Sequence, residues 1–195
     1  AALAIGGDTD PGIVGKTEFW DGTSWTEIAD LGTSRRQSFG SGINTAALAT
    51  GGYTTTQVAN TEEFTAPAVF NQKVEGQLFF NSTANAFKET ILDVPGGTWA
   101  SGNTTPYSGY YWGSAGTQTS NIIGGGYGPS GITNASAQYD GTNWTSAPNI
   151  NDGREMVSGF GASNTAALIV AGDSPGFTGA TEQWDGSSWT EKNDL

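Results

Sequence analysis

Side chains that carry most acid–base, nucleophilic and metal chemistry are scarce in this sequence. Its 195 residues include no histidine and no cysteine, which removes the commonest general base, the commonest metal ligand and all thiolate reactions. A Ser-His-Asp triad cannot be assembled. Aspartate and glutamate could still supply two carboxylates for glycoside hydrolysis, but no spacing marks such a pair. The sequence therefore predicts a protein that is not an enzyme and that uses no cofactor.

Two aspartates in one predicted loop, Asp8 and Asp10, offer oxygen ligands of the kind that calcium prefers. Calcium needs six or more ligand oxygens, however, and no EF-hand or other repeated calcium pattern follows. The pair is kept as a calcium candidate, although solvated loop carboxylates are the favoured interpretation. The sequence predicts no metal site elsewhere.

Aromatic and arginine side chains near predicted loops could form a binding surface. Aromatic rings stack on sugar rings, and arginine can clamp an acidic group. A sugar platform would use the aromatics of PYSGYYWG, which are Tyr107, Tyr110, Tyr111 and Trp112, because they break the register of the repeat. Part of this cluster could instead line a central channel, and the arginines could cap loop carboxylates. The residues predicted to contact a ligand are Arg36, Tyr53, Trp112, Tyr127, Arg154 and Asp173.

The elements that must position these residues recur along the chain. Ala1–Trp25 is repeated closely at Ala46–Phe64 and Ala166–Trp189, and more loosely at Ser120–Trp144. Most offsets lie near the roughly 40–50 residues of a four-stranded propeller blade. Each repeat is typical of an inner strand, an apolar second strand, a Gly-rich loop, a third strand, a tight turn and a fourth strand. The chain thus divides at about residues 1–32 (unit 1), 33–102 (unit 2), 103–149 (unit 3) and 150–195 (unit 4).

Glycines and aromatics recur at fixed places in these units. They are Gly6-Gly7, Trp20 and Trp25; Gly51-Gly52, Phe64 and Trp99; Gly125-Gly126, Tyr139 and Trp144; and Gly172, Trp184 and Trp189. The glycines predict positive φ angles or close backbone approach, and the Asp-Gly pairs at Asp21, Asp140 and Asp185 predict hairpin turns. This pattern resembles the blades of kelch and galactose-oxidase-like propellers, except where Ala171-Gly172 replaces the glycine pair. The resemblance implies an all-β, kelch-like β-propeller of about four blade units, each with four antiparallel strands.

Recurrence also bears on the role of the repeated residues. A binding platform or a catalytic carboxylate is not expected in every unit, whereas packing between repeats is. We therefore expect the repeated aromatics to pack between blades. Glu18, Glu62 and Glu182, which recur at one place, are predicted to be structural.

Residues 65–97 form an insertion in unit 2, where the other units have an Asp-Gly turn. The sequence alternates on both sides of Asn81–Asn85, which predicts a protruding β-hairpin with Gly76–Phe80 paired to Ala86–Ile91. A lone hairpin cannot bury its apolar side chains, so we expect them to pack on the blade or on another chain. The phrase GQLFFNSTANAFK resembles a short element common in phage tail-fibre and other virion proteins.

Composition narrows the possible partners. The formal net charge is −12 and the pI is about 4.1, so phosphate would be repelled and no nucleic-acid partner is expected. No run approaches the roughly 18 apolar residues that a membrane span needs, so no membrane insertion is expected. The acidity suits a virion surface or an extracellular location.

Composition and the two resemblances together lead us to expect a non-enzymatic structural or adhesive protein. It would be part of a viral, phage-type tail fibre, appendage or virion surface, with other copies or other virion proteins as partners and loops that bind a host-surface glycan or receptor. Two alternatives stay open: a secreted carbohydrate-binding or glycan-active propeller, and a kelch-type protein-interaction domain. Because unit 1 begins at its second strand, we also expect a piece of a longer chain or a ring completed by other copies.

Overall fold

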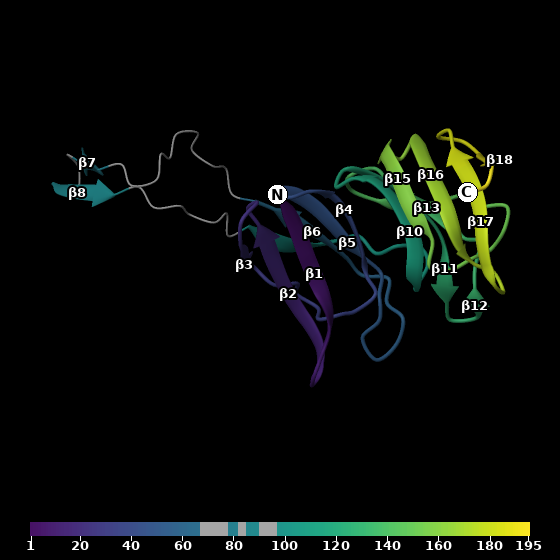
Figure 1. Cartoon of the computed structure of the whole chain (residues 1–195), viewed down its shortest axis with the longest axis horizontal. Helices are drawn as coiled ribbons and strands as arrows, with labels where there is room; N and C mark the ends of the chain where they lie inside the picture. Colours follow the sequence, from purple (N-terminus) through teal and green to yellow (C-terminus); the bar gives the residue numbers. More distant parts are fainter. Residues whose placement is uncertain (67–77, 82–84, 90–96) are drawn as a thin grey trace.

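The computed structural model of the protein describes residues 1–66, 78–81, 85–89 and 97–195. In these residues the backbone forms strands and turns and no helix, which confirms the all-β prediction. Four antiparallel sheets of three to five strands follow one another along the chain. Each of the four is built from one predicted unit (Figure 1).

Strands pair in chain order within every sheet, so each sheet is an antiparallel meander. The first contains β1 (Ala2–Thr9), β2 (Gly12–Trp20) and β3 (Trp25–Glu27); the second contains β4 (Phe39–Ile43), β5 (Ala46–Thr50), β6 (Thr61–Thr65) and β9 (Thr98–Gly102). The third contains β10 (Tyr110–Thr117), β11 (Ser120–Gly128), β13 (Ser136–Tyr139) and β14 (Trp144–Ala147), with β12 (Gly131–Ile132) paired to β11. The fourth contains β15 (Ser158–Ser163), β16 (Ala166–Asp173), β17 (Phe177–Trp184) and β18 (Trp189–Lys192).

The pairing registers identify which residues of different units are equivalent. Leu3 pairs with Phe19, Leu48 with Glu63, Ile122 with Gln138 and Leu168 with Gln183. These four residues of the second strands therefore occupy one place in the repeat. Because successive side chains of a strand point to opposite faces, the next residues, Ala4, Ala49, Ile123 and Ile169, lie on the other face of their sheets.

Successive sheets are joined by one repeated backbone hydrogen bond. The N–H of Gly7 donates to the carbonyl of Arg35 at 3.0 Å, that of Gly52 to Gly109 at 2.9 Å, and that of Gly126 to Arg154 at 2.8 Å. The preceding glycine lies so close to the same carbonyl that a Cβ on Gly6 or Gly125 would come within 2.6 Å of it. The predicted close approach at the glycine pairs is confirmed, and positive φ angles accompany it.

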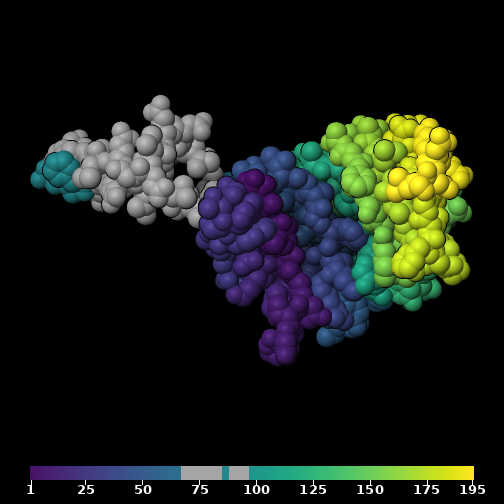
Figure 2. Space-filling view, viewed as in Figure 1, coloured from purple at the N-terminus to yellow at the C-terminus, as the bar shows by residue number. Residues whose placement is uncertain are grey.

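The sheets form a row that does not close within the described part of the chain. The innermost strand β10 packs between β4 and β15, and two apolar clusters fill the spaces between units 2 and 3 and between units 3 and 4. The sheet of β1–β3 and the sheet of β15–β18 lie at opposite ends of the row (Figures 1 and 2).

The repeated aromatics of units 3 and 4 pack between sheets as predicted, whereas in unit 1 Trp25 is 50% exposed. In each unit the aromatic before the turn lies 5.0–5.3 Å from the following tryptophan, measured between ring centroids. In units 3 and 4 both rings of the pair are buried. The rings therefore belong to the cores between sheets, and they are not available as a sugar platform in these units.

The predicted insertion contains a two-stranded hairpin, β7 (Leu78–Asn81) with β8 (Ala86–Glu89). This confirms pairing of the predicted arms where they are described, and the hairpin lies apart from the four sheets in Figure 1. The remaining predicted ends of the arms, and the rest of the insertion at 67–77, 82–84 and 90–96, lie outside the described residues. The side chain of Phe87 is 72% exposed.

The predicted Asp-Gly turns connect the third and fourth strands of units 1, 3 and 4. In the last of them, the Asp185 carboxylate accepts the backbone N–H groups of Ser187 and Ser188, both at 2.8 Å. Asp21 and Asp140 accept the equivalent pair of N–H groups. Hydrogen bonds to a carboxylate favour its charged form, so the pKa of all three aspartates is lowered.

We expect the Asp185 carboxyl to titrate at about pH 2 in the folded protein, because the Ser187 and Ser188 groups donate to it. In the unfolded chain an aspartate titrates near pH ~3.9. The unfolded state then binds more protons between these values, so this contribution to stability is full above about pH 4 and is lost as the pH falls toward 2. Carbon NMR of the carboxyl group measures the midpoint, and a midpoint near 4 would contradict the turn geometry.

Two buried ion pairs lie at equivalent places in units 2 and 4. Arg35 Nη1 lies 2.8 Å from Glu62 Oε1, and Arg154 Nη1 lies 2.7 Å from Glu182 Oε1, with both arginine side chains 0% exposed. The second oxygen of each carboxylate accepts a backbone N–H from the segment that joins the unit to the one before it. Burial lowers the pKa of Arg35, and the Glu62 carboxylate counteracts that effect. The structural role predicted for Glu62 and Glu182 is confirmed.

Unit 3 lacks both partners of this ion pair. Gly109 and Ala137 stand at the equivalent places, and the Trp112 ring fills the space, since a Cβ on Gly109 would lie 2.7 Å from it. Trp112 is 1% exposed and belongs to the core between units 2 and 3. One unit therefore replaces a buried charge pair with an apolar ring.

Replacing Glu182 by leucine should destabilise the protein by about 3–5 kcal/mol, because it leaves the Arg154 guanidinium buried without a counter-charge. The double change Arg154→Leu with Glu182→Leu should cost less than this single change. Urea unfolding followed by fluorescence measures both. As a control, Glu27→Gln breaks the exposed Lys16–Glu27 pair and should leave the unfolding midpoint unchanged. Equal midpoints for the control and Glu182→Leu would contradict the burial of the charge.

Candidate functional site

Two places in the repeat bring side chains together at one end of the sheets. One is the residue after the glycine pair, which is Asp8, Tyr53, Tyr127 or Asp173. The other lies at the start of the inner strand or just before it. There the backbone of Arg36 forms a β-bridge with Tyr53, that of Tyr110 pairs with Tyr127, and that of Glu155 forms a β-bridge with Asp173. The structure therefore aligns one pair of side chains from each of units 2, 3 and 4.

A backbone turn fixes the direction of the second set. Gln37, Tyr111 and Met156, the residues that follow Arg36, Tyr110 and Glu155, have φ angles of 56–60°. Non-glycine residues take up this left-handed conformation at a cost of about 1–3 kcal/mol, and it tends to occur where a site needs it. The same turn in three units holds the preceding side chains in one row.

Tyrosine rings form the middle of this row. The Tyr53 and Tyr110 centroids lie 6.1 Å apart with the rings edge to face, and those of Tyr110 and Tyr127 lie 5.3 Å apart with the rings stacked. Tyr111 lies 4.8 Å from Tyr110, and its hydroxyl accepts a hydrogen bond from Gln37 Nε2 at 2.5 Å. We call these four residues, Tyr53, Tyr110, Tyr111 and Tyr127, the tyrosine row.

Charged groups lie at both ends of the tyrosine row. At one end Arg36 pairs with Asp8 of unit 1, and its guanidinium carbon lies 5.1 Å from the centroid of the Tyr53 ring. This contact is a cation–π interaction. At the other end lie Glu155 and Asp173. Because Arg36 already has a carboxylate partner, the row as a whole does not present an unpaired cation to an acidic ligand.

Burial and neighbouring negative charge raise the pKa of two residues on this surface, Tyr110 and Glu155. Desolvation raises the pKa of Tyr110, and the neighbouring Tyr127 and Glu155 raise it further. Desolvation also raises the pKa of Glu155, with a smaller contribution from the Asp173 charge. Tyr110 is thus a neutral hydroxyl at neutral pH, able to donate and accept hydrogen bonds. The row offers aromatic faces and neutral hydroxyls.

Four of the six residues predicted to contact a ligand lie on this surface: Arg36, Tyr53, Tyr127 and Asp173. The other two do not, which corrects the prediction. Arg154 is 0% exposed in its ion pair with Glu182, and Trp112 is 1% exposed in the core. Arg154 precedes β15, and its side chain is enclosed between sheets. Trp112 lies within β10 and packs between sheets, and it also lines a hollow beside Tyr107.

Sequence reasoning missed Gln37 and Glu155, and it placed Tyr110 and Tyr111 in a cluster that breaks the repeat. The register shows that Tyr110 is equivalent to Arg36 and Glu155. Counting back from the second glycine of each unit aligns Tyr110 with Arg36 and Tyr111 with Gln37, but it misses Glu155, because the register of β15 against β16 shifts between Gly161 and Ser163. The predicted calcium candidates do not gather a third ligand: among the described residues no group of three or more acidic side chains could hold a metal ion.

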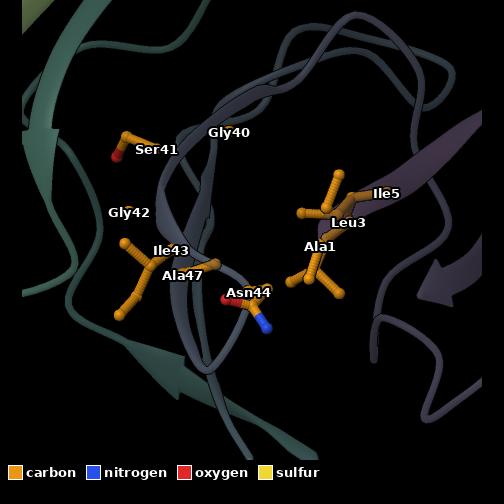
Figure 3. Close-up of a pocket in the computed structure, with 10 residues that line it drawn as sticks. Ala1, Leu3, Ile5, Gly40, Ser41, Gly42, Ile43, Asn44 and Ala47 are labelled. Atoms are coloured by element: carbon orange, nitrogen blue, oxygen red, sulfur yellow. The ribbon is translucent and has the colours of Figure 1, made fainter. Parts of the chain in front are cut away.

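Hollows elsewhere on the surface differ in chemistry from the row. One of about 430 Å³ lies between β1 and β4, and Figure 3 shows Leu3 and Ile5 on one side of it and Ser41 and Ile43 on the other. Another, of about 370 Å³, is lined by Tyr107, Ser108, Trp112 and Thr133 among others, and by no member of the tyrosine row. It has two aromatic rings, hydroxyls and no charged side chain.

Comparison with models of known protein families finds no match, and comparison with curated proteins finds none either. Within the described ranges, the structure contains no helix with the length and apolarity to cross a membrane. The functional argument therefore rests on the geometry of the tyrosine row.

Glu155→Gln should lower the pKa of Tyr110, because it removes a negative charge that disfavours the phenolate. Tyr110 should still titrate above its ordinary value of about 10, since burial remains the larger cause. NMR of ring-labelled tyrosine follows this titration. The control Glu27→Gln, on β3, should leave it unchanged, and an unchanged Tyr110 in Glu155→Gln would contradict the arrangement of the row.

Proposed function

We propose that this protein is a non-enzymatic adhesive module of the β-propeller type that binds a glycan through the tyrosine row. The observation that carries the proposal is that units 2 and 3 bring Tyr53, Tyr110 and Tyr127 into contact at one end of the sheets. A scaffold of this kind would serve on the surface of a virion, in a tail fibre or a similar appendage.

The arrangement of the sheets supports a propeller. In units 2, 3 and 4 the strands run in order from an innermost strand to an outermost one, and the innermost strands β4, β10 and β15 are neighbours. Propeller blades are four-stranded meanders arranged in this way around a central axis. The repeated hydrogen bond from the second glycine to the next unit gives successive blades the same spacing.

The chemistry of the surface supports a sugar ligand. Aromatic faces stack on the apolar faces of sugar rings, while hydroxyls and loop carboxylates can bond to the sugar hydroxyls. Tyr53, Tyr110, Tyr111 and Tyr127 are all partly exposed. Negative groups at the end of the row, Glu155 and Asp173, favour a neutral glycan over a highly acidic one.

A non-enzymatic role is consistent with the side chains on this surface. General acid–base catalysis needs a group whose pKa lies near the working pH and that reaches the substrate. Histidine is absent, and Arg36 is held by Asp8. Glu155 and Asp173 are paired through their backbones at the end of the row beside Tyr110, and we assign them to binding sugar hydroxyls.

A glycan array of neutral and acidic polysaccharides tests the proposal directly. We expect retention of a neutral polysaccharide, and a loss of about 2- to 12-fold in affinity for each of Tyr53→Ala and Tyr110→Ala, since one aromatic contact contributes about 0.5–1.5 kcal/mol. The control is Ile43→Ser, which changes an exposed apolar residue at the far end of β4 and should bind as the unchanged protein does.

Two outcomes would count against this function. Retention that is identical in the tyrosine variants and in the unchanged protein would place the ligand elsewhere. Release of oligosaccharides from a bound polysaccharide during prolonged incubation would show a glycan-active enzyme, which would overturn the non-enzymatic assignment while leaving the binding surface in place.

A further inference from the structure

One side-chain hydrogen bond recurs at all three contacts between successive units. Its donor has an equivalent in unit 1, and its acceptor has an equivalent in unit 4. The outer tryptophan of each later unit donates its indole N–H to a hydroxyl on the strand that precedes the outermost one in the unit before. Trp99 donates to Thr17 at 3.2 Å, Trp144 to Thr61 at 3.0 Å, and Trp189 to Ser136 at 3.3 Å. Trp25 is the equivalent donor of unit 1, and Thr181 is the equivalent hydroxyl of unit 4.

The sheet of unit 4 exposes apolar residues at places that are buried in the unit before it. Ala115 and Ile122 of unit 3, and Ile150 of the segment that follows β14, are 1–3% exposed in the core shared with the sheet of unit 4. Their equivalents in unit 4 are Phe160, Leu168 and Leu195, which are 59%, 38% and 86% exposed. We call these three residues and Thr181 the acceptor face.

A hollow marks the place where an indole would lie on the acceptor face. It has a volume of about 710 Å³ and is lined by Leu168, Thr181, Glu191, Lys192 and Asn193. Leu48 and Thr61 are the equivalents of Leu168 and Thr181 in unit 2, where Leu48 shares a core cluster with Trp144 and Thr61 accepts its N–H. The hollow on unit 4 therefore has the walls of a tryptophan site.

Unit 1 shows the complementary exposure on its opposite side. Trp184 and Trp189 of unit 4 are 1% and 7% exposed beneath unit 3, whereas the equivalent Trp25 is 50% exposed. Ala2 and Ala4, which stand at the places of Ala167 and Ile169, are also exposed. We call Ala2, Ala4, Trp20 and Trp25 the donor face.

We infer that two copies of this chain associate head to tail, with the donor face of one copy on the acceptor face of the other. Trp25 of one copy enters the hollow at Leu168, and its indole N–H donates to the Thr181 hydroxyl. The contact repeats the tryptophan and apolar part of the interface that joins units 1 to 2, 2 to 3 and 3 to 4 within one chain, and it covers the exposed apolar side chains of both faces.

The contact is heterologous, because the two faces are different surfaces, and this makes a mixing experiment decisive. Trp25→Ala removes the donor side chain and keeps the acceptor face. Leu168→Glu places a charge on the acceptor face, at a side chain that is already 38% exposed, and keeps Trp25. Each variant alone should be a monomer of 20.1 kDa, and an equimolar mixture should give a dimer that does not grow further.

Sedimentation equilibrium of the unchanged chain, each variant and the mixture gives the masses, and circular dichroism confirms that the variants are folded. The unchanged chain should gain mass with concentration. The milder changes Trp25→Phe and Thr181→Val, which delete the donor and the acceptor of one hydrogen bond, should each weaken association about 2- to 12-fold. Phe177→Ser is the control: it removes a residue that is 90% exposed outside both faces and should associate as the unchanged chain does.

Three results would overturn the inference: a monomeric unchanged chain at every concentration, self-association of both variants at unchanged strength, or a mixture that stays monomeric. None of the substitutions touches the tyrosine row, so glycan binding tests the proposed function separately from association. Failure of one experiment leaves the other interpretable.

Discussion

The architecture depends on one backbone hydrogen bond, from the second glycine of a pair to a carbonyl that precedes the next inner strand. Gly52 and Gly109 make it between units 2 and 3, at 2.9 Å. The bond needs a first glycine without a Cβ, since any side chain there would meet the same carbonyl. With the backbones this close, a tryptophan on the outermost strand reaches a hydroxyl of the unit before it. The spacing of the sheets, and with it the shape of each core, follows from that contact.

Buried charge is tolerated in this packing because each guanidinium has both a carboxylate and a backbone carbonyl. Arg35 binds Glu62 and the carbonyl of Ala49, and Arg154 binds Glu182 and the carbonyls of Ala171 and Asp152. Unit 3 reaches the same packing with Trp112 in place of the pair. An ion pair and an apolar ring of similar extent are interchangeable here, as expected where desolvation of the charges offsets most of their attraction. What each unit must supply is side-chain volume between the sheets, since one nitrogen of each guanidinium, Arg35 Nε and Arg154 Nη2, is buried without a hydrogen-bond partner.

The sequence predicted local structure correctly at residues whose type favours one conformation or one environment. Double glycines, Asp-Gly turns and recurring aromatics predicted the order of strands, the turns and the packed rings. It failed where two distant residues compensate each other. Gly109 and Ala137 lie far apart in the sequence. Together they leave the space that the Trp112 ring fills, but neither residue alone predicts that Trp112 is buried. It was partial at the tyrosine row: Tyr53 and Tyr127 could be found from the glycine pairs, but their contacts with Tyr110 depend on the turn before each inner strand.

The same repeat explains why the candidate site lies where it does. A side chain between two sheets must fill the core that the sheets share, so this place of the repeat holds the buried aromatic residues Phe64, Tyr139 and Trp184. The residue after the glycine pair is held by the same backbone bonds but projects to the end of the sheets, and there Asp8, Tyr53, Tyr127 and Asp173 differ in charge and shape. A rigid scaffold that presents variable side chains in register is how binding surfaces are commonly built. In this chain the two central units present tyrosines, and the first and last present carboxylates, so the aromatic contact surface lies in the middle of the row.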